Sequence, residues 1–202
     1  MQSETKAMVN ESIETKRLVQ EKLAAKIEEA VQLVIKALKN NKKILIAGNG
    51  GSASQAAHIA AEFVGRYKIE RKAMPCISLT TDLAAITAIG NDYGFDTIFE
   101  RQIEALGNEG DVFIALSTSG NSKNLIRAVE AARKLNVHVI GLLGKDGGKL
   151  KKLLLSMLEN SHASTSSVEI IVPSFNTPRI QEAHLMILHI ICELVEKELF
   201  DK

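Results

Sequence analysis

The amino-acid sequence predicts an α/β fold, an αβα sandwich with a parallel five-stranded sheet between two layers of helices. Five short apolar runs alternate with amphipathic stretches between residues 42 and 178. Runs that are apolar throughout are typical of strands covered on both faces. Strands that alternate with helices indicate parallel pairing through helical crossovers. With a helical arm before this unit (1–41) and a long helix after it (179–202), we expect one domain over 1–202.

The arm comes first in the chain. From Glu4 to Asn40 the sequence is rich in Ala, Leu, Glu, Lys and Gln, and its apolar residues recur at helical spacing. This pattern predicts one long helix or two shorter ones. Because the arm precedes the first strand, we expect it to pack on the outside of the βα units or on another subunit.

The βα units follow in order. The expected strands are 43–48, 76–79, 111–116, 137–142 and 168–172. The expected helices between them are 54–64, 82–89, 96–106, 123–135 and 149–158. Pro178 marks the start of the last helix, and the polar stretch 159–167 is expected to be a loop. His138 is expected in a strand and His162 in that loop.

Composition and charge argue against a nucleic-acid-binding, membrane-spanning or secreted protein. Hydrophobic residues make up 46% and charged residues 24% of the chain, close to the average globular protein. A formal charge of +1 gives no reason to expect nucleic acid as a partner. No apolar stretch reaches the ~18 residues of a membrane span, and the first residues do not resemble a secretory signal. We therefore expect a cytoplasmic protein, with Cys76 and Cys192 as buried, reduced thiols.

Two loops have the composition of anion sites. The segments 48–54 and 117–122 each follow a strand and lead into a helix. Their glycines allow close approach of the backbone, and their hydroxyl and N–H groups, with the helix N-terminus behind them, suit a phosphate. The same residue types are also ordinary turn and N-cap residues, so either loop alone also fits a structural role. Neither has the spacing of a dinucleotide fingerprint or a P-loop, which disfavours nucleotides.

Six motifs carry a resemblance to a known family. They are GNGGSAS at 48–54, GNDYG at 90–94, GDV at 110–112, STSGNS at 117–122, GKDGG at 144–148 and RIQEAH at 179–184. Together they resemble the bacterial phosphoheptose isomerases, members of the sugar isomerase (SIS) domain superfamily with a flavodoxin-like sandwich. The serine loop is general to the superfamily, whereas its combination with 58–62 and 181–189 is specific to the heptose branch. The segment 149–168 departs from the family by about ten extra residues, which leaves the matched motifs intact.

The resemblance implies a homotetramer that converts sedoheptulose 7-phosphate into D-glycero-D-manno-heptose 7-phosphate. This is the first step toward ADP-heptose for lipopolysaccharide or capsule, and the family carries one zinc ion per subunit. The residues that match substrate-binding positions are Asn49, Gly50, Gly51, Ser52, Glu62, Asn91, Asp92, Ser117, Thr118, Ser119, Ser122 and Gln181. The residues that match zinc positions are His58, Glu62, Gln181 and His189, and Glu62 and His189 match the proton-transfer pair.

The chemistry agrees with part of this assignment. Ketose–aldose isomerisation needs a base, an acid for the carbonyl oxygen and stabilisation of negative charge. His58 and Glu62 are four residues apart on an expected helix and therefore share a face. Gln181 and His189 are separated by about 12 Å of rise and about 80° of rotation on one helix, too far to share one ion. A neighbouring subunit that supplies one of the two is the simplest geometry. By local spacing His184 is a rival to His189, but its place in the family motif is not a ligand position.

Two alternatives remain at this point. One is a non-catalytic SIS-domain tetramer that acts as a binding or replication-initiation regulator. The other is an isomerase or sensor for a different sugar phosphate, because the two loops indicate phosphate binding but not the number of carbon atoms in the sugar. As the family is understood, the regulators lack the full set of His58, Glu62 and His189, so its presence favours catalysis.

Overall fold

The computed structural model describes residues 1–159 and 165–200. Its centre is a parallel five-stranded sheet, as the sequence predicted, and the strand order is β2-β1-β3-β4-β5. The strands are β1 Ile44–Gly48, β2 Cys76–Ser78, β3 Val112–Ser117, β4 His138–Gly144 and β5 Ser167–Val172. His138 is the first residue of β4, in agreement with its expected place in a strand.

Helices connect the strands and flank the sheet. They are α1 Gln2–Lys39, α2 Gly51–Val64, α3 Leu83–Tyr93, α4 Glu100–Leu106, α5 Lys123–Lys134, α6 Gly148–Glu159 and α7 Thr177–Phe200. The helix expected over 96–106 is divided into a short 3-10 turn, Phe95–Thr97, and α4. Gly94, whose φ is +90°, separates the 3-10 turn from the end of α3. Ile98 and Phe99 between the two pieces are buried in the core.

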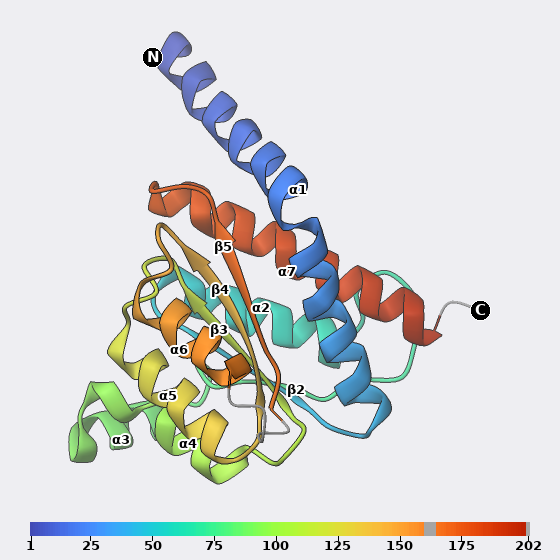
Figure 1. The fold of residues 1–202 in the computed structure, drawn as a ribbon, viewed down its shortest axis with the longest axis vertical. Helices are drawn as coiled ribbons and strands as arrows, with labels where there is room; N and C mark the ends of the chain where they lie inside the picture. Colours follow the sequence, from blue (N-terminus) through green and yellow to red (C-terminus); the bar gives the residue numbers. More distant parts are fainter. Residues whose placement is uncertain (160–164, 201–202) are drawn as a thin grey trace.

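The arm is a single helix. The sequence between Gln2 and Lys39 contains neither glycine nor proline, so nothing in it interrupts the helix. At 1.5 Å per residue its 38 residues span about 57 Å. Its first buried residue is Thr15, and Figure 1 shows the N-terminal half projecting beyond the rest of the molecule.

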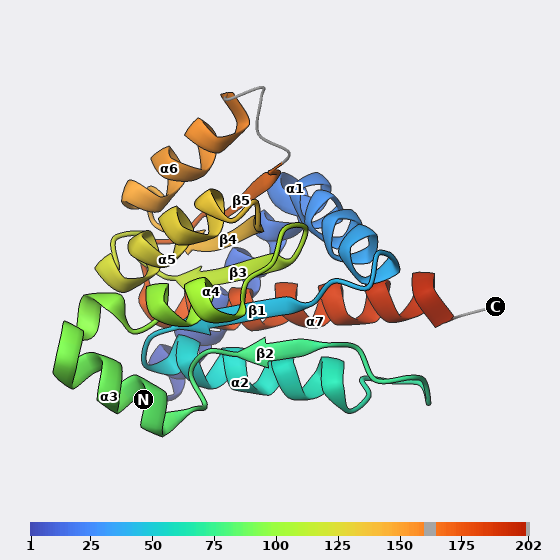
Figure 2. The ribbon, with the colours of Figure 1, turned by 90° about the horizontal axis from the view of Figure 1, so that it is seen from below.

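Two hydrophobic cores cover the two faces of the sheet. Alternate strand residues such as Ile44 and Ile46 pack with α1, α2 and α7. Their neighbours Leu45 and Ala47 pack with α4, α5 and α6 on the opposite face. These layers are visible in the two perpendicular views of Figures 1 and 2. The expected αβα sandwich is therefore confirmed.

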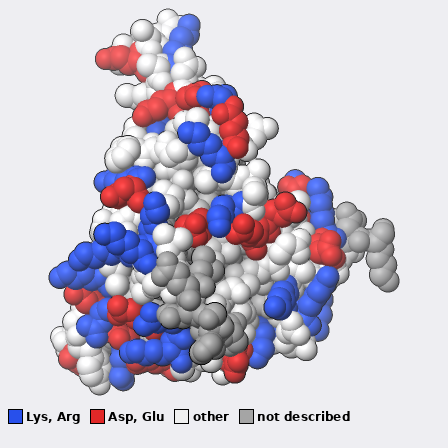
Figure 3. Space-filling model, in the orientation of Figure 1, with Lys and Arg blue, Asp and Glu red and all other residues white. Residues whose placement is uncertain are grey.

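The surface is mixed in charge. Figure 3 shows Lys and Arg interspersed with Asp and Glu over the face that it presents, in keeping with the formal charge of +1. None of the helices over 1–159 and 165–200 combines the length and the apolar character that a membrane span requires.

Candidate functional site

The two phosphate-type loops meet at one edge of the sheet. Strands β1 and β3 are neighbours, and Gly48 at the end of β1 is paired with Leu116 near the end of β3. The chain order reverses between these two strands, since β2 lies beyond β1 and β4 lies beyond β3. Crevices at such switch points are the usual ligand sites of open α/β sheets. The fold therefore places the segments 48–54 and 117–122 at the ends of neighbouring strands.

The first loop is tightly packed. A Cβ atom on Gly51 would lie 2.7 Å from Nε2 of Gln181, and one on Gly48 would lie 2.6 Å from Cβ of Ser52. Asn49 exchanges two amide hydrogen bonds, of 3.0 and 2.9 Å, with Asn124 at the start of α5. This reciprocal pair fixes the first loop to the helix that follows the second.

The second loop is closed by its own hydroxyls. The Ser117 hydroxyl lies 3.3 Å from that of Ser122 and accepts the Gly120 N–H at 3.1 Å. The Ser119 hydroxyl accepts the N–H of Asn121 at 3.2 Å. Thr118 lies half-buried between them. Several hydroxyl groups thus gather in front of α5, at a helix N-terminus of the kind that binds phosphate.

Glycine is required at the tip of this loop. Gly120 has a φ of +65°, and a Cβ there would lie 1.9 Å from the carbonyl oxygen of Gly147. The Gly120 carbonyl in turn accepts the N–H of Leu150 at 2.9 Å. The loop is therefore held against the turn that follows β4, and its shape is set before any ligand arrives.

A second cluster lies on α2 and α7. His58 Nε2 is 3.0 Å from Glu62 Oε1, and His189 Nε2 is 3.4 Å from His58 Nε2. The Tyr67 ring stacks on His189, with centroids 5.6 Å apart and planes inclined by 30°. The side chains of His58 and Glu62 are 45% and 25% exposed, so a ligand has access to both. We call His58, Glu62 and His189 the histidine cluster.

The histidine cluster is suited to proton transfer and to ligation. Burial lowers the pKa of His189, the nearby His58 lowers it further, and Glu62 partly opposes both effects. His189 is therefore mainly a neutral imidazole at neutral pH, the form that accepts a proton or binds a metal ion. The choice of His189 over His184 agrees with the structure, because His184 is fully buried and donates from Nε2 to the Leu143 carbonyl at 2.9 Å.

The other residues matched by sequence lie elsewhere within the chain. Gln181 lies beside Gly51, and its carbonyl accepts a hydrogen bond of 2.8 Å from Gln55. It does not join the histidine cluster of its own chain. Asn91 and Asp92 lie exposed on α3, which buries none of its residues, and Asn91 donates to Asp92 at 2.8 Å.

The loops and the histidine cluster lie at different ends of α2. Ser52 is in the first turn of this helix, and Glu62 comes ten residues later, about 15 Å along the axis. His58, six residues after Ser52, lies about 9 Å along the same axis. The first loop and the histidine cluster therefore occupy successive turns of one helix.

The donor types of the histidine cluster fit zinc, but one chain does not enclose the ion. Two imidazole nitrogens and one carboxylate oxygen are common zinc ligands. Nevertheless, across 1–159 and 165–200, no three His, Cys, Asp or Glu side chains surround a metal position. A zinc ion at His58 would need at least one ligand from outside this chain.

The two cysteines lie in the hydrophobic core. Cys76 and Cys192 are free and buried, as predicted, and burial raises the pKa of both thiols, that of Cys192 to about 12. His162 lies outside the described residues.

Sequence reasoning did not single out Asn124 or Tyr67. The position of Asn124 just after the serine loop was a usable signal, whereas nothing in the sequence around Tyr67 links it to α7.

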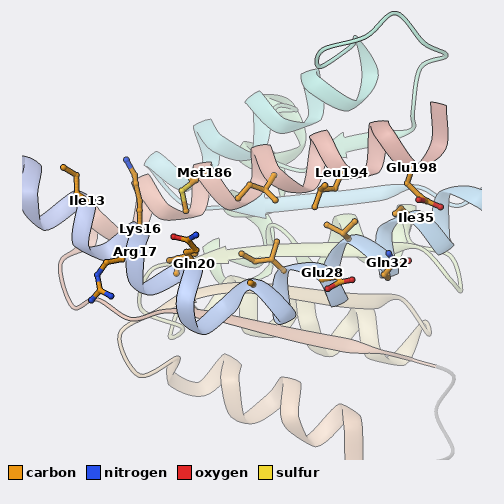
Figure 4. A pocket seen from close by; sticks show the side chains of 15 residues that line it. Ile13, Lys16, Arg17, Gln20, Glu28, Gln32, Ile35, Met186, Leu194 and Glu198 are labelled. Carbon is orange, nitrogen blue, oxygen red and sulfur yellow. The ribbon is translucent and has the colours of Figure 1, made fainter. Parts of the chain in front are cut away.

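A groove lies away from both parts of the site. It measures about 770 Å³ and runs between α1 and α7 (Figure 4). Its wall is mostly apolar, with Ile13, Ile35, Met186 and Leu194 along its length. Charged side chains such as Arg17 and Glu198 stand at its margins.

Comparisons with known proteins agree on one family. The model of the SIS domain family matches residues 8–144. A phosphoheptose isomerase of Citrifermentans bemidjiense is 51% identical over 199 residues, which cover 98% of this chain and 97% of the relative. One of Helicobacter pylori is 50% identical over 182 residues, 90% of this chain and 88% of the relative. The solved structure of a phosphoheptose isomerase from Neisseria gonorrhoeae superposes with a TM-score of 0.88 at 42% identity, over 97% of this chain and 98% of that one.

Proposed function

This chain belongs to the phosphoheptose isomerases of the SIS-domain family, which are ketose–aldose isomerases, and we propose that it converts sedoheptulose 7-phosphate into D-glycero-D-manno-heptose 7-phosphate. The observation that carries the proposal is the convergence of His58, Glu62 and His189, three side chains from two helices, at distances of 3.0 and 3.4 Å. A base, a second proton carrier and a ligand set for a cation are the groups that an enediol mechanism requires.

The roles divide between the two parts of the site. We assign the phosphate to Ser52 and to the hydroxyl and N–H groups of the loop 117–122, with Asn49, Gly50 and Gly51 beside the sugar. In this assignment the Glu62 carboxylate removes the proton from the carbon next to the carbonyl group. His189 donates a proton to the carbonyl oxygen at C2 and then removes the hydroxyl proton at C1 as the enediol collapses, while Glu62 returns a proton to C2. Asn91 and Asp92 are assigned to the sugar hydroxyls of a substrate held against α3.

Zinc is proposed as the cofactor, held by His58, Glu62 and His189 together with Gln181 of a neighbouring copy. Bound there, zinc would polarise the carbonyl oxygen and stabilise the negative charge of the enediolate. The donor set supports this role, and the position of Gln181 beside Gly51 explains why a second chain is needed to complete it. Coordination would lower the basicity of the Glu62 carboxylate, so the base role assigned to Glu62 would require a carboxylate oxygen that the metal does not hold.

We infer self-association as a homotetramer, and the position of Gln181 apart from the histidine cluster of its own chain supports association of at least two copies. The loops of one chain and the histidine cluster of another would together span one substrate. The surface for such an assembly is the groove between α1 and α7, beside which Met8, Val9 and Ile13 are 61%, 52% and 59% exposed on the projecting arm. A second copy of the arm, itself apolar along this stripe, is the occupant that this groove fits best.

The product class and the location complete the proposal. We assign the reaction to the first step of ADP-heptose formation for lipopolysaccharide or capsule, in the cytoplasm. The alternative, a non-catalytic SIS-domain tetramer that regulates replication initiation, needs no histidine cluster. The partly exposed cluster beside a stacked tyrosine therefore favours the isomerase.

The test is an isomerase assay on the purified protein. Sedoheptulose 7-phosphate is incubated with the protein in deuterated water, and the heptose product and its deuterium content are followed by NMR. We expect turnover with deuterium at C2 of the product, the former carbonyl carbon, and we expect this turnover to be lost after chelation and restored by zinc. Absence of turnover with zinc present, for a folded oligomer, would overturn the proposed activity. Full turnover after chelation would overturn only the metal.

A further inference from the structure

A buried ion pair joins the loop after α2 to the last helix. Arg71 and Glu196 are 1% and 3% exposed, and Nε of the arginine lies 3.0 Å from Oε1 of the glutamate. Such deeply buried charges are rare and are kept where further hydrogen bonds satisfy them. The groups that supply these bonds show what the pair holds in place.

The Glu196 carboxylate organises the loop. It accepts the backbone N–H groups of Tyr67, Lys68 and Ile69 at 3.1, 2.8 and 3.2 Å. Burial alone would raise the pKa of Glu196, but these three donors and Arg71 together lower it below its ordinary value. One side chain of α7 thus fixes three consecutive residues that have no regular secondary structure of their own.

The Arg71 guanidinium holds the end of α2. It donates to the carbonyl groups of Glu62 at 2.7 Å, Phe63 at 2.8 Å and Gly65 at 3.2 Å. Carbonyl groups in the last turn of a helix lack partners within the helix, and a cation is favoured beside them. Arg71 therefore caps α2 at the residue that carries the proposed base.

The same loop holds the other member of the proton-transfer pair. The Tyr67 ring stacks on the His189 ring, and its backbone N–H is bound to Glu196, seven residues after His189 on α7. Displacement of the loop would therefore move Tyr67 away from the imidazole. It would also release the end of α2 that carries Glu62.

We propose that Tyr67, Arg71 and Glu196 are positioning residues for the proton-transfer pair. The buried ion pair fixes the backbone of Glu62 through the cap on α2, and it fixes the His189 ring through Tyr67. The phosphate loops at the other end of α2 do not depend on these contacts. This inference rests on the proposed roles of Glu62 and His189.

The main test replaces both charges, Arg71→Met together with Glu196→Met. Loss of both partners leaves no unpaired buried charge, so the oligomer is expected to fold. Because a displacement of about 1 Å costs about 10²-fold in rate, kcat should fall by about that factor. KM and the inhibition constant of inorganic phosphate should stay near the wild-type values. Wild-type kcat in the double variant, or an equal loss of phosphate binding, would overturn the inference.

A second pair of variants decides the matter if the double variant does not fold. Tyr67→Leu removes the stacked ring and should lower kcat at constant KM, whereas Tyr67→Phe keeps the ring and should keep kcat. Equal kcat in Tyr67→Leu and Tyr67→Phe would contradict the positioning role. The matched control is Glu193→Gln, which removes an exposed bond of 2.7 Å from the same helix to Lys68 of the same loop, and it should leave both constants unchanged. A wild-type protein without isomerase activity would refute the proposed function instead.

Discussion

The serine loop and the histidine cluster differ in how they are held. The loop 117–122 is fixed inside one chain by its own hydroxyls, by the positive φ of Gly120 and by close packing on Gly147. The histidine cluster joins two helices through side chains, with His58 45% exposed and no three ligands arranged around a metal in the described part of the chain. A site for an unreactive phosphate can be rigid within one chain, whereas the proposed reacting end is more open to solvent and to a ligand.

The largest expected effect is on the reacting end. Glu62→Gln keeps the volume and a hydrogen-bonding oxygen beside His58 but cannot accept a proton. General base catalysis is worth about 10²–10⁴-fold, so kcat should fall by at least that range while the oligomer persists. Deuterium exchange into the substrate should be lost in Glu62→Gln even where His189→Gln retains slow exchange. Exchange at the wild-type rate in Glu62→Gln would transfer the role of base to another residue, with Asp92 or His189 as the next candidates.

A mixing experiment tests whether the two regions come from different chains. Glu62→Gln subunits have intact loops, and subunits with Ser119→Ala and Ser122→Ala have an intact histidine cluster. If each site combines two chains, co-expressed hetero-oligomers should recover activity at substrate concentrations near the wild-type KM, because some sites receive both intact parts. At these concentrations the Glu62→Gln parent lacks the base and the serine-loop parent binds little substrate. Hetero-oligomers isolated with two different affinity tags provide the measurement. Activity no greater than the average of the parents would place the whole site within one chain.

The contact between α7 and β4 should make the stability of the fold depend on pH. His184 anchors α7 to the Leu143 carbonyl at the end of β4, and burial lowers its pKa to about 4 from an ordinary 6.5. The unfolded chain therefore binds the proton first as pH falls, so the free energy of unfolding decreases between pH 6.5 and about 4. The difference corresponds to about 3 kcal/mol at most.

Urea unfolding at several pH values measures this decrease in the free energy of unfolding. His184→Gln retains an N–H donor for Leu143 and should show a smaller loss of stability between pH 6.5 and 4 than the wild type. His138, whose pKa burial also lowers, is present in both proteins and cancels in the comparison. Identical pH dependence in the two proteins would mean that His184 is not the group that titrates.

The sequence predicted the rigid region better than the reacting one, for a physical reason. The strands, the glycines and the serine loop are encoded by local patterns, and parallel pairing brings loops at the ends of β1 and β3 together without further information. The contacts of Tyr67 and Arg71 with α7 join residues more than 120 positions apart. No local pattern encodes them. The arm was ambiguous between one helix and two for a related reason, because its first half packs against little of its own chain.

The smallest expected effect is a loss of binding in the loop. Ser119→Ala removes a hydroxyl that the proposal places on the phosphate, together with the bond from the Asn121 N–H. A hydrogen bond to a charged group contributes about 1–3 kcal/mol, which is roughly a 5- to 150-fold rise in KM with kcat little changed. Inhibition by inorganic phosphate should weaken in the same proportion, since the hydroxyl meets the phosphate in both cases.

A serine at the end of the neighbouring strand supplies the control for this last prediction. The Ser78 hydroxyl lies 2.7 Å from that of Thr80 at the end of β2, outside the loop, so Ser78→Ala should leave KM and phosphate inhibition unchanged. A fall of kcat at constant KM in Ser119→Ala would mean that the loop takes part in the reaction itself. The two regions would then share the chemistry, because loss of a group that only binds phosphate weakens the ground state and the transition state alike.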